Sequence, residues 1–385
     1  MQKTKVVFII THPIQYYVPL LQGLSKNEQL IIHVLYTWGE DSIAKFDPGF
    51  NKTIEWDMPL LEGYNYRFLK NIAKDVGSHH YRGIDNPDII NEIQQLNPDK
   101  IVVFGWKYKS HLKVLRKFHG KIPIYFRGDS HLLNEGKGLK KILRRLFLRW
   151  IYKHVDFAIS VGTENKAYYK AMGMNESQIL FAPHAIDESR FLMMKDTPSS
   201  KAWQSLIKIP DHHITFIYIG KFEYRKNLET LIKAKKILNQ EPCTLLLVGS
   251  GPDEQKLKKL AEGDQNIHFH GFVNQADIVG MYQLADVYIL PSHSETWGLG
   301  VNEAMNAGLA LILSDKVGCA IDLLKNNGLI FKSMDEFDLA SKINTLVNNK
   351  ELLLKMKKES TDIISSWSIK KLISSFEQIL IGNDI

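Results

Sequence analysis

Residues 286–308 read DVYILPSHSETWGLGVNEAMNAG and combine a short apolar strand, a loop and the start of a helix. The loop carries the carboxylate Glu295 and the glycines Gly298 and Gly300, and the helix carries Glu303 about one turn from its start. Glycines before a helix let backbone N–H groups approach an anion, and the helix N-terminus adds about half a positive charge. The segment therefore fits a nucleoside diphosphate whose ribose bonds to the second carboxylate. The spacing alone also allows a chance pair of glutamates beside a tight turn.

The rest of the chain alternates short β-branched runs with amphipathic stretches. This alternation is typical of parallel strands linked by crossover helices, so the expected class is α/β with two doubly wound sheets in sequence. Strands are expected at 5–10, 31–36, 100–104, 123–126, 157–160 and 179–181, and then at 215–219, 244–248, 267–269, 287–290 and 310–313. Helical patterns between them include 17–24, 87–96 and 165–172.

A polar stretch with a helix-disfavouring proline, residues 197–200, indicates a connector between two domains. We place the boundary near residue 190, with a first domain at 1–190 and a second at 191–365. The tail, residues 366–385, has a helical apolar stripe with no strand after it, and we expect it to pack on the first domain.

The composition excludes several classes of protein. The chain has 385 residues, of which 44% are hydrophobic and 24% charged, enough for two or three domains with real cores. Its two cysteines, Cys243 and Cys319, have no C-x-x-C spacing, which excludes a disulfide framework or a zinc module. No apolar run approaches the ~18 residues that cross a bilayer, and no cleavage site follows the first strand. We therefore expect a cytosolic protein with neither a signal peptide nor a membrane span.

The formal net charge is +7, and all of the excess basicity falls in the first half of the chain. Its densest part is 137–153, which has no acidic residue and predicts a basic amphipathic helix. Its cations are Lys137, Lys140, Lys141, Arg144, Arg145, Arg149 and Lys153. One interpretation is an interfacial helix on anionic lipid. The alternative is a core helix that buries Leu143, Phe147 and Trp150 and leaves its basic side in water.

Four segments, in one order, carry a resemblance to a known family. Residues 286–308 resemble the E-x7-E signature of retaining glycosyltransferases of family 4, the glycosyltransferase group 1 type, in the form E-x-[FW]-G-L-x-x-x-E-A-x-x-x-G. Residues 220–227, GKFEYRKN, are similar to the family's G-R-x(4)-K segment. Residues 247–252, LVGSGP, resemble its V-G-x-G-P turn, and 270–273, HGFV, its G-x-V loop near the nucleobase.

The resemblance covers about 213–330 and, more loosely, PHAID at 183–187, which is similar to the family's hinge. It implies the GT-B architecture, in which two Rossmann-like domains face a central cleft and a C-terminal helix crosses back to the first domain. The first domain would bind the acceptor, and the second would bind the nucleotide-sugar donor.

The resemblance also implies a role for each matching residue. Lys221 and Lys226 would neutralise the donor diphosphate, Glu303 would hold the ribose, and Glu295 would lie near the transferred sugar. The family usually has arginine where this chain has Lys221, and an ammonium lacks the bidentate fork of a guanidinium, which the neighbouring Arg225 offers. The implied donor contacts are Gly220, Arg225, Gly249, Phe272, Val273, Thr296, Trp297, Gly298, Leu299, Gly300 and Glu303.

The first half offers further candidates at strand ends, where open α/β sheets bind ligands. His12 follows the first strand, where many relatives have a G-G loop, and would orient the acceptor hydroxyl or the donor phosphate, or else cap a helix. Asp129 and His131 follow the expected strand 123–126 and are candidates for contacts to the reacting hydroxyl. The alternative is that Asp129 and Ser130 simply begin a turn. Trp106 would stack on a sugar or pack in the core.

These features favour a retaining hexosyltransferase that moves a sugar from a nucleoside diphosphate sugar to an acceptor hydroxyl, in assembly of a bacterial surface polysaccharide or lipid-linked glycan. The alternatives are a basic GT-B enzyme that glucosylates nucleic acid, a non-catalytic nucleotide-sugar-binding protein, and an epimerase of similar fold. Few aromatic residues interleave with the basic ones, which disfavours nucleic acid.

The expected reaction needs no cofactor besides the donor. A metal-dependent transferase would usually carry an acidic D-x-D at a strand end, and none is evident, so we expect metal independence. The expected partners are the donor, a glycan or lipid-linked acceptor, and an anionic membrane surface at 137–153. The expected location is the cytoplasm, peripheral to the inner face of the membrane.

Overall fold

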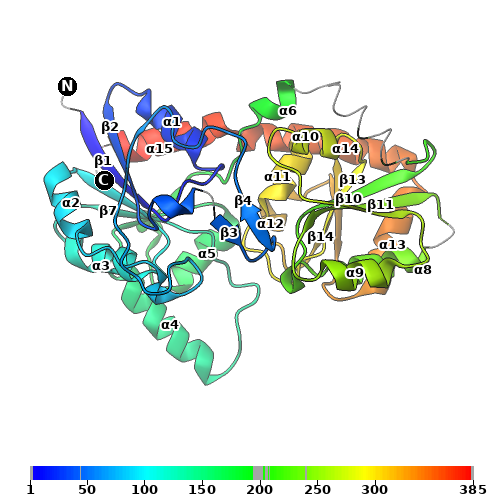
Figure 1. Ribbon diagram of the computed structural model, residues 1–385, viewed down its shortest axis with the longest axis horizontal. Helices are drawn as coiled ribbons and strands as arrows, with labels where there is room; N and C mark the ends of the chain where they lie inside the picture. The colour runs from blue at the N-terminus through cyan, green and yellow to red at the C-terminus, as the bar shows by residue number, and fades with distance from the viewer. Residues whose placement is uncertain are drawn as a thin grey trace. The chain divides into compact units, whose positions relative to one another are not determined.

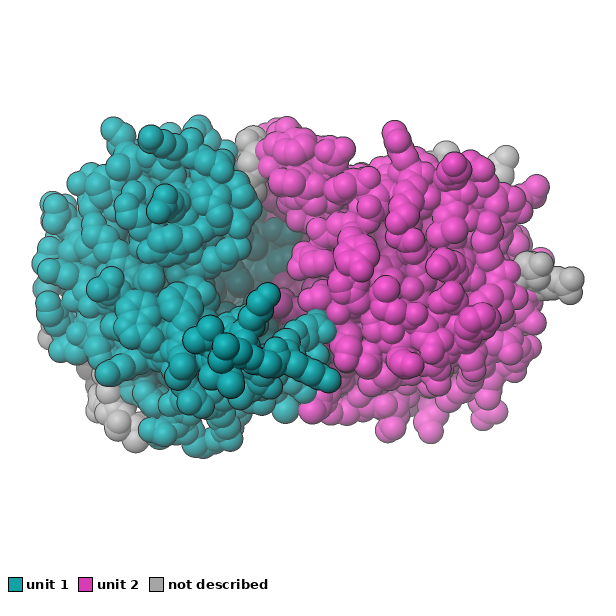
Figure 2. Space-filling model, turned by 90° about the horizontal axis from the view of Figure 1, so that it is seen from below, with its two compact units in different colours: residues 1–45, 59–184, 369–385 teal, residues 46–58, 185–368 magenta. Residues whose placement is uncertain are grey.

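A computed structural model describes residues 3–43, 45–193, 203, 207, 209–238 and 241–382. The expected connector at 197–200 lies outside these residues. The chain forms two compact units, coloured separately in Figure 2. Unit 1 comprises Met1–Lys45, Pro59–His184 and Ile369–Ile385, and unit 2 comprises Phe46–Met58 and Ala185–Ser368.

Unit 1 is built on a seven-stranded parallel sheet in the order β5-β2-β1-β6-β7-β8-β9. Its strands are β1 (Thr4–Ile10), β2 (Leu30–Tyr36), β5 (Asn65–Phe68), β6 (Lys100–Phe104), β7 (Ile124–Arg127), β8 (Phe157–Ser160) and β9 (Ile179–Phe181). Its helices are α1 (Val18–Ser25), α2 (Ile89–Leu96), α3 (Lys109–Phe118), α4 (Leu139–Tyr152), α5 (Thr163–Ala171) and α15 (Ile369–Ile381). Every residue of the central strand β6 is buried, as expected where helices cover both faces of a parallel sheet (Figure 1).

Unit 2 holds a six-stranded parallel sheet in the order β12-β11-β10-β13-β14-β15. Its strands are β10 (Ile214–Lys221), β11 (Cys243–Ser250), β12 (Ile267–His270), β13 (Val287–Leu290), β14 (Ala310–Ser314) and β15 (Gly328–Phe331). Its helices are α6 (Ser189–Met193), α8 (Leu228–Ile237), α9 (Glu254–Ala261), α10 (Ile278–Tyr282), α11 (Leu299–Asn306), α12 (Ala320–Leu323), α13 (Glu336–Val347) and α14 (Lys350–Ile364). The direction of strand progression reverses between β10 and β13, as it does between β1 and β6 in unit 1. Both units are therefore Rossmann-like, and the expected fold class is confirmed.

The segment 46–58 corrects the expected domain bounds, because it belongs to unit 2 although it lies within 1–190. It contributes to a two-stranded sheet of β3 (Lys45–Asp47) and β4 (Lys52–Ile54). The hydroxyl of Ser250 donates to the Phe50 carbonyl at 2.8 Å. The Phe272 ring lies 5.0 Å from that of Phe50 and 6.2 Å from that of Trp56. These contacts explain why 46–58 belongs to unit 2. The boundary between the units also falls after His184 rather than near residue 190.

The C-terminal helix α15 packs within unit 1 against α1 and β1. Leu372, Phe376 and Leu380 are buried, and the Phe376 ring lies 6.4 Å from that of Phe8 on β1. The apolar stripe of the tail thus covers the sheet of unit 1, which confirms the C-terminal helix that the family resemblance implies.

Helix α4 differs from the core helix that was one of its two interpretations. Leu143, Phe147 and Trp150 are exposed, whereas Leu148, Ile151 and Tyr152 are buried. The side of α4 that packs on the domain is therefore not its main apolar side.

Candidate functional site

The loop at residues 220–227, called the basic loop below, follows β10 in unit 2. The Nζ atom of Lys221 lies 2.9 Å from each carboxylate oxygen of Asp47 and 5.1 Å from the centre of the Phe50 ring. Asp47 belongs to the segment 46–58. That segment therefore supplies an anionic partner for Lys221, a residue predicted to bind the donor diphosphate. Asp47 was not evident from the sequence, because 174 positions separate it from Lys221.

Lys226 pairs with Glu295, which joins the two strongest motifs of the sequence in one site. The Lys226 ammonium donates to Glu295 Oε2, and the side chains are only 17% and 14% exposed. The hydroxyl of Ser292 donates to the same Oε2 atom at 3.2 Å. An ion pair this sheltered from water is weakly screened, so its charges act strongly on any group placed beside them.

The backbone fixes this pairing. Asn227 adopts a left-handed conformation with φ 55°, and its side-chain amide donates to the Pro291 carbonyl at 3.1 Å. The His293 amide donates to the Arg225 carbonyl at 3.0 Å. The basic loop and the loop after β13 therefore hold each other, and the geometry of Lys226 and Glu295 depends on both.

The glycine Gly298 precedes α11 and has φ 97°, a region that a side chain rarely adopts. It turns the chain so that α11 starts at the carboxyl end of β13, with its first amides beside the Glu295 loop. Inside α11, Glu303 is buried and accepts a hydrogen bond from the Tyr282 hydroxyl at 2.9 Å. Its ribose role stays a prediction, and its partner Tyr282 was not evident from the sequence.

Trp297 lies in the core, because its side chain is 3% exposed and its indole N–H donates to Asn302 Oδ1 at 2.9 Å. Its ring also lies 5.3 Å from that of Trp367. A donor contact by Trp297 would therefore have to use its backbone.

The turn after β11 approaches the basic loop closely. A Cβ atom at Gly249 would lie 1.9 Å from the Gly220 carbonyl oxygen, so only glycine fits there. The Phe222 amide donates to the Ser250 carbonyl at 2.9 Å. Gly249 is therefore needed for the close approach of the two backbones, which holds the basic loop in place. Phe272 and Val273 follow β12 at the same edge of the sheet.

These loops therefore meet at the carboxyl ends of β10, β11 and β13. The order of strands reverses between β10 and β13. Ligands of open α/β sheets bind at such a switch point. The structure thus brings Lys221, Lys226, Glu295 and the start of α11 to the expected ligand edge of unit 2.

The predicted residues of unit 1 lie at the corresponding edge of its sheet. His12 Nδ1 is 2.9 Å from Thr11 Oγ1, and its ring contacts Trp38 edge-on at 5.2 Å. His131 Nδ1 accepts from the Leu133 amide at 3.0 Å, a local contact that organises the turn.

Asp129 lies near a buried group that was not evident from the sequence. Arg127 donates to the Ala182 and Pro183 carbonyls at 3.1 and 3.0 Å, and burial lowers its pKa to about 10. Desolvation raises the pKa of Tyr17 to about 12, and the charge of Asp129 adds to this shift. The burial of Arg127 at the end of β7 was not evident, because arginine at a strand end usually faces water.

A pocket of about 410 Å³ opens in unit 1 at the carboxyl ends of β2 and β5. Trp38, Glu40, Asp41, Lys70 and Asn71 are among its lining residues. An indole face beside carboxylates and an amide suits a saccharide, because sugars present C–H faces and hydroxyl groups. Through Trp38 this pocket adjoins His12.

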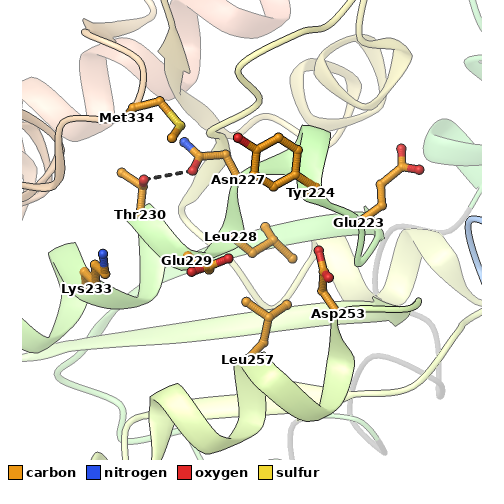
Figure 3. Close-up of a pocket in the computed structure, with 10 residues that line it drawn as sticks. All are labelled: Glu223, Tyr224, Asn227, Leu228, Glu229, Thr230, Lys233, Asp253, Leu257 and Met334. Carbon is orange, nitrogen blue, oxygen red and sulfur yellow. Dashed lines mark hydrogen bonds between the residues drawn. The ribbon is translucent and has the colours of Figure 1, made fainter.

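A smaller cavity, of about 110 Å³, lies behind the basic loop (Figure 3). Glu223, Glu229 and Asp253 line it with Lys233 and Asn227. Three carboxylates against one ammonium would repel a diphosphate, so this cavity is not the donor site.

Metal-type ligands come together elsewhere. Within the described ranges, Asp75, His79 and His80 form the one group of three, with ligand atoms within 4.8 Å of one another. The group lies in unit 1, outside the donor motifs.

Comparisons with known proteins bear on the family and the fold of the chain. Residues 200–362 match the family model Glycosyl transferases group 1. The chain is 24% identical over 287 residues to the sulfoquinovosyl transferase SQD2 of Arabidopsis thaliana, covering 69% of this chain and 53% of that protein. It is 27% identical over 237 residues to the N,N'-diacetylbacillosaminyl-diphospho-undecaprenol alpha-1,3-N-acetylgalactosaminyltransferase of Campylobacter jejuni, covering 58% and 61%. The chain thus spans about half the length of the curated relatives that it matches, and these matches support a group 1 glycosyltransferase.

The fold is shared with solved structures, among them a glycosyltransferase of Rickettsia africae, with a TM-score of 0.72 at 13% identity, covering 100% of both chains. The Anabaena protein Alr3699/HepE, crystallised with UDP and glucose, superposes with a TM-score of 0.71 at 17% identity, covering 99% of this chain and 100% of that one. The architecture is GT-B. Across the part of the chain that the structure describes, no helix combines the length and apolarity needed to cross a membrane.

Proposed function

We propose that the protein is a retaining glycosyltransferase of family 4 that moves a hexosyl group from a nucleoside diphosphate sugar to an acceptor hydroxyl. The observation that carries the proposal is the pairing of Lys226 with Glu295 at the switch point of the sheet in unit 2. The pairing places a cation suited to bind a diphosphate next to a carboxylate suited to bind sugar hydroxyls, beside the N-terminus of a helix. Such a site suits a ligand that carries both a diphosphate and a sugar.

In this proposal, Lys226 and Lys221 stabilise the charge that develops on the departing diphosphate. The amides of Gly298, Leu299 and Gly300 add the positive end of α11. Because Lys221 is bonded to Asp47, diphosphate binding would exchange a carboxylate partner for phosphate oxygens. Glu303 would hold the ribose of the donor.

The C1–O bond to the diphosphate breaks as the acceptor oxygen attacks C1 from the same face, and the acceptor proton leaves to a diphosphate oxygen. No protein nucleophile is needed. Glu295 would hold sugar hydroxyls and stabilise the oxocarbenium-like carbon. Asp129, His131 and His12 in unit 1 would orient the acceptor, and Trp38 would add a stacking surface for it.

The donor diphosphate is neutralised by lysines and amides in this scheme, so we propose that no metal ion or other cofactor takes part. We place the reaction on the cytoplasmic side of a bacterial membrane, in assembly of a surface polysaccharide or lipid-linked glycan. The name of the Campylobacter relative, which specifies a diphospho-undecaprenol acceptor, supports the lipid-linked class.

A donor screen tests the proposal. Stabilisation by UDP-, GDP- and ADP-sugars is measured by thermal unfolding, where a ligand at about 100 times its Kd adds ~2.7 kcal/mol. The best donor is then used in a turnover assay, and NMR of the first product gives the configuration at C1. One nucleotide series should stabilise the protein, and the product should keep the donor's anomeric configuration. Stabilisation by none of the three series would overturn the donor proposal, and an inverted product would overturn retention.

A further inference from the structure

Helix α4 carries a row of large apolar side chains that its own unit leaves largely uncovered, although the Phe147 ring lies 5.9 Å from that of Trp106. These side chains, called the apolar row below, are between 41% and 70% exposed. They are Leu139, Ile142, Leu143, Leu146, Phe147 and Trp150. At 100° per residue the apolar row occupies one side of α4, and the buried residues Leu148, Ile151 and Tyr152 occupy the opposite side. Exposed apolar side chains gathered in this way mark an interaction surface rather than chance exposure.

The cations of α4 flank the apolar row on both sides. Lys140 and Arg144 lie along one side, and Arg145 and Arg149 lie along the other. Arg145 binds Glu135 through two hydrogen bonds of 2.7 and 2.6 Å. Lys141 reaches the same carboxylate at 2.9 Å, so Glu135 ties this side of the helix to the preceding loop. The helix itself carries no acidic residue.

A neighbouring helix extends the cationic surface. The Arg116 guanidinium of α3 lies 5.6 Å from the centre of the Trp150 ring. Trp150 is the last residue of the apolar row, and its indole lies beside the Arg116 cation. This is the amphipathic environment of a membrane interface, where the ring lies between headgroups and acyl chains.

We infer that α4 is a membrane-docking helix, which inserts the apolar row into one leaflet of an anionic bilayer while its cations contact the lipid phosphates. Charge decides between this occupant and a second copy of the chain. A dimer through the apolar row would bring two acid-free basic helices together, whereas an anionic leaflet neutralises them. An interfacial helix needs an apolar side with cations along its flanks, which is the arrangement of α4.

The free end of α4 follows, along the chain, the loop that carries two of the proposed acceptor residues. Residues 139–147 of α4 include no buried side chain, and α4 stands out from the body of unit 1 at this end (Figure 1). The loop that enters this end comes from β7 and carries Asp129 and His131. Resting on the proposed function, this placement would keep the acceptor edge of unit 1 at the lipid surface, as a lipid-linked acceptor requires.

Vesicle co-sedimentation of the full chain tests the inference. Binding to POPC/POPG (70:30) vesicles is compared with binding to POPC vesicles at 20 and 300 mM NaCl. Two variants are compared. Lys137→Gln/Lys140→Gln/Arg144→Gln removes one cation just before α4 and two within it, and Leu143→Gln/Leu146→Gln changes the apolar row. The matched control, Lys350→Gln/Lys355→Gln/Lys358→Gln, removes the same charge from exposed positions of α14 in unit 2. Melting temperatures and size-exclusion chromatography check folding and oligomeric state.

We expect the wild type to bind POPC/POPG vesicles with an affinity that falls as salt is raised. The affinity should fall roughly a hundredfold in the cationic variant and at least roughly tenfold in the apolar variant, and should not change in the control. Brominated acyl chains should quench the tryptophan emission of the wild type more than that of Trp150→Phe. Equal losses in the cationic variant and the control would overturn the inference, as would no binding at 20 mM NaCl. A wild-type dimer that Leu143→Gln/Leu146→Gln makes monomeric would assign the apolar row to a second copy instead. If the double variant does not fold, Leu146→Gln alone replaces it, with the same expected direction. None of these readouts needs turnover, so their failure leaves the donor proposal intact.

Discussion

Replacing Lys226 by methionine should remove most of the activity while the protein still folds. Methionine keeps the apolar length of the side chain and deletes its charge. Because Lys226 and Glu295 are 17% and 14% exposed, the free-energy cost falls between that of an exposed pair, ~0–1 kcal/mol, and that of a buried pair broken on one side, ~3–5 kcal/mol. We expect a loss of about 2 kcal/mol in the free energy of unfolding.

The effect on catalysis should be larger, because Lys226 would act on charge that develops at the diphosphate. Removing such a stabilising group costs ~2–4 kcal/mol in the transition state, or roughly 30- to 1000-fold in kcat/KM. Initial rates with the donor from the screen, and urea unfolding of the same samples, measure the two effects separately. Lys226→Arg is the control, because it keeps the charge near Glu295.

A double-mutant cycle with Glu295→Gln then separates the ion pair from its two members. Breaking the pair from either side should cost stability, and the double variant should cost less than the sum of the single ones, since no unpaired charge remains. A folded Lys226→Met protein with wild-type kcat/KM would refute the role of Lys226. Additive unfolding energies would show that the pair contributes nothing to the fold.

Four further predictions follow from the two units. Asp47→Asn should tighten binding of the nucleoside diphosphate about fivefold by calorimetry, because the carboxylate no longer competes for Lys221; weaker binding would mean that Asp47 instead positions Lys221. Burial lowers the pKa of His111 to about 4 and of His184 to about 3, so below pH 6.5 the unfolded chain binds protons that the folded chain does not. Between pH 6.5 and its folded pKa, each histidine should therefore lower the free energy of unfolding by about 1.4 kcal/mol per pH unit. Urea unfolding at pH 7.5 and 5.5 measures this loss, and equal free energies of unfolding at the two pH values would mean that the rings are charged in the folded protein. Trp38→Ala should raise KM for the acceptor at least tenfold without changing donor Kd, and equal changes in both would remove this pocket from acceptor binding. EDTA should leave the transfer rate unchanged, and a rate restored only by added divalent cation would disprove metal independence.

The core strands were predictable because they are buried on both faces. The expected strand 100–104 coincides with β6, and 287–290 coincides with β13, since continuous apolar runs in parallel sheets leave few other interpretations. β5 was missed because its residues are mostly exposed and alternate poorly, and β15 because it begins at a glycine. Short edge strands are fixed by pairing with a neighbour, which a local pattern does not reveal.

The site was predictable where its residues share a local motif, and not where they come together only in three dimensions. The spacing of Glu295 and Glu303, and the lysines after β10, were visible in the sequence. Asp47 and Tyr282 were not, because each reaches its partner, Lys221 or Glu303, from another element. Similarly, the periodicity of α4 showed an apolar side, but only packing determines which side faces the domain.

The carboxylates found in the structure change how the basic loop would act on a donor. Lys221 is bonded to Asp47, Arg225 to Glu223 at 2.7 Å, and Lys226 to Glu295. Each cation of the loop thus has an anionic partner, so the loop does not attract phosphate through a large net positive charge. Binding of a diphosphate would instead exchange one set of charge-assisted hydrogen bonds for another, and the free energy of that exchange is the difference between two strong interactions.

Such an exchange favours the transition state over the bound donor. Before the sugar leaves, the diphosphate shares its charge with the sugar ester and competes poorly with the carboxylates. As the C1–O bond breaks, negative charge builds on the diphosphate, and its electrostatic attraction to Lys221 and Lys226 becomes stronger. Glu295, released from Lys226, would then face the positive carbon that forms at the same moment. The pairing of Lys226 with Glu295 therefore allows both charges of the transition state to be stabilised together, which is why we expect their substitutions to lower kcat more than donor affinity.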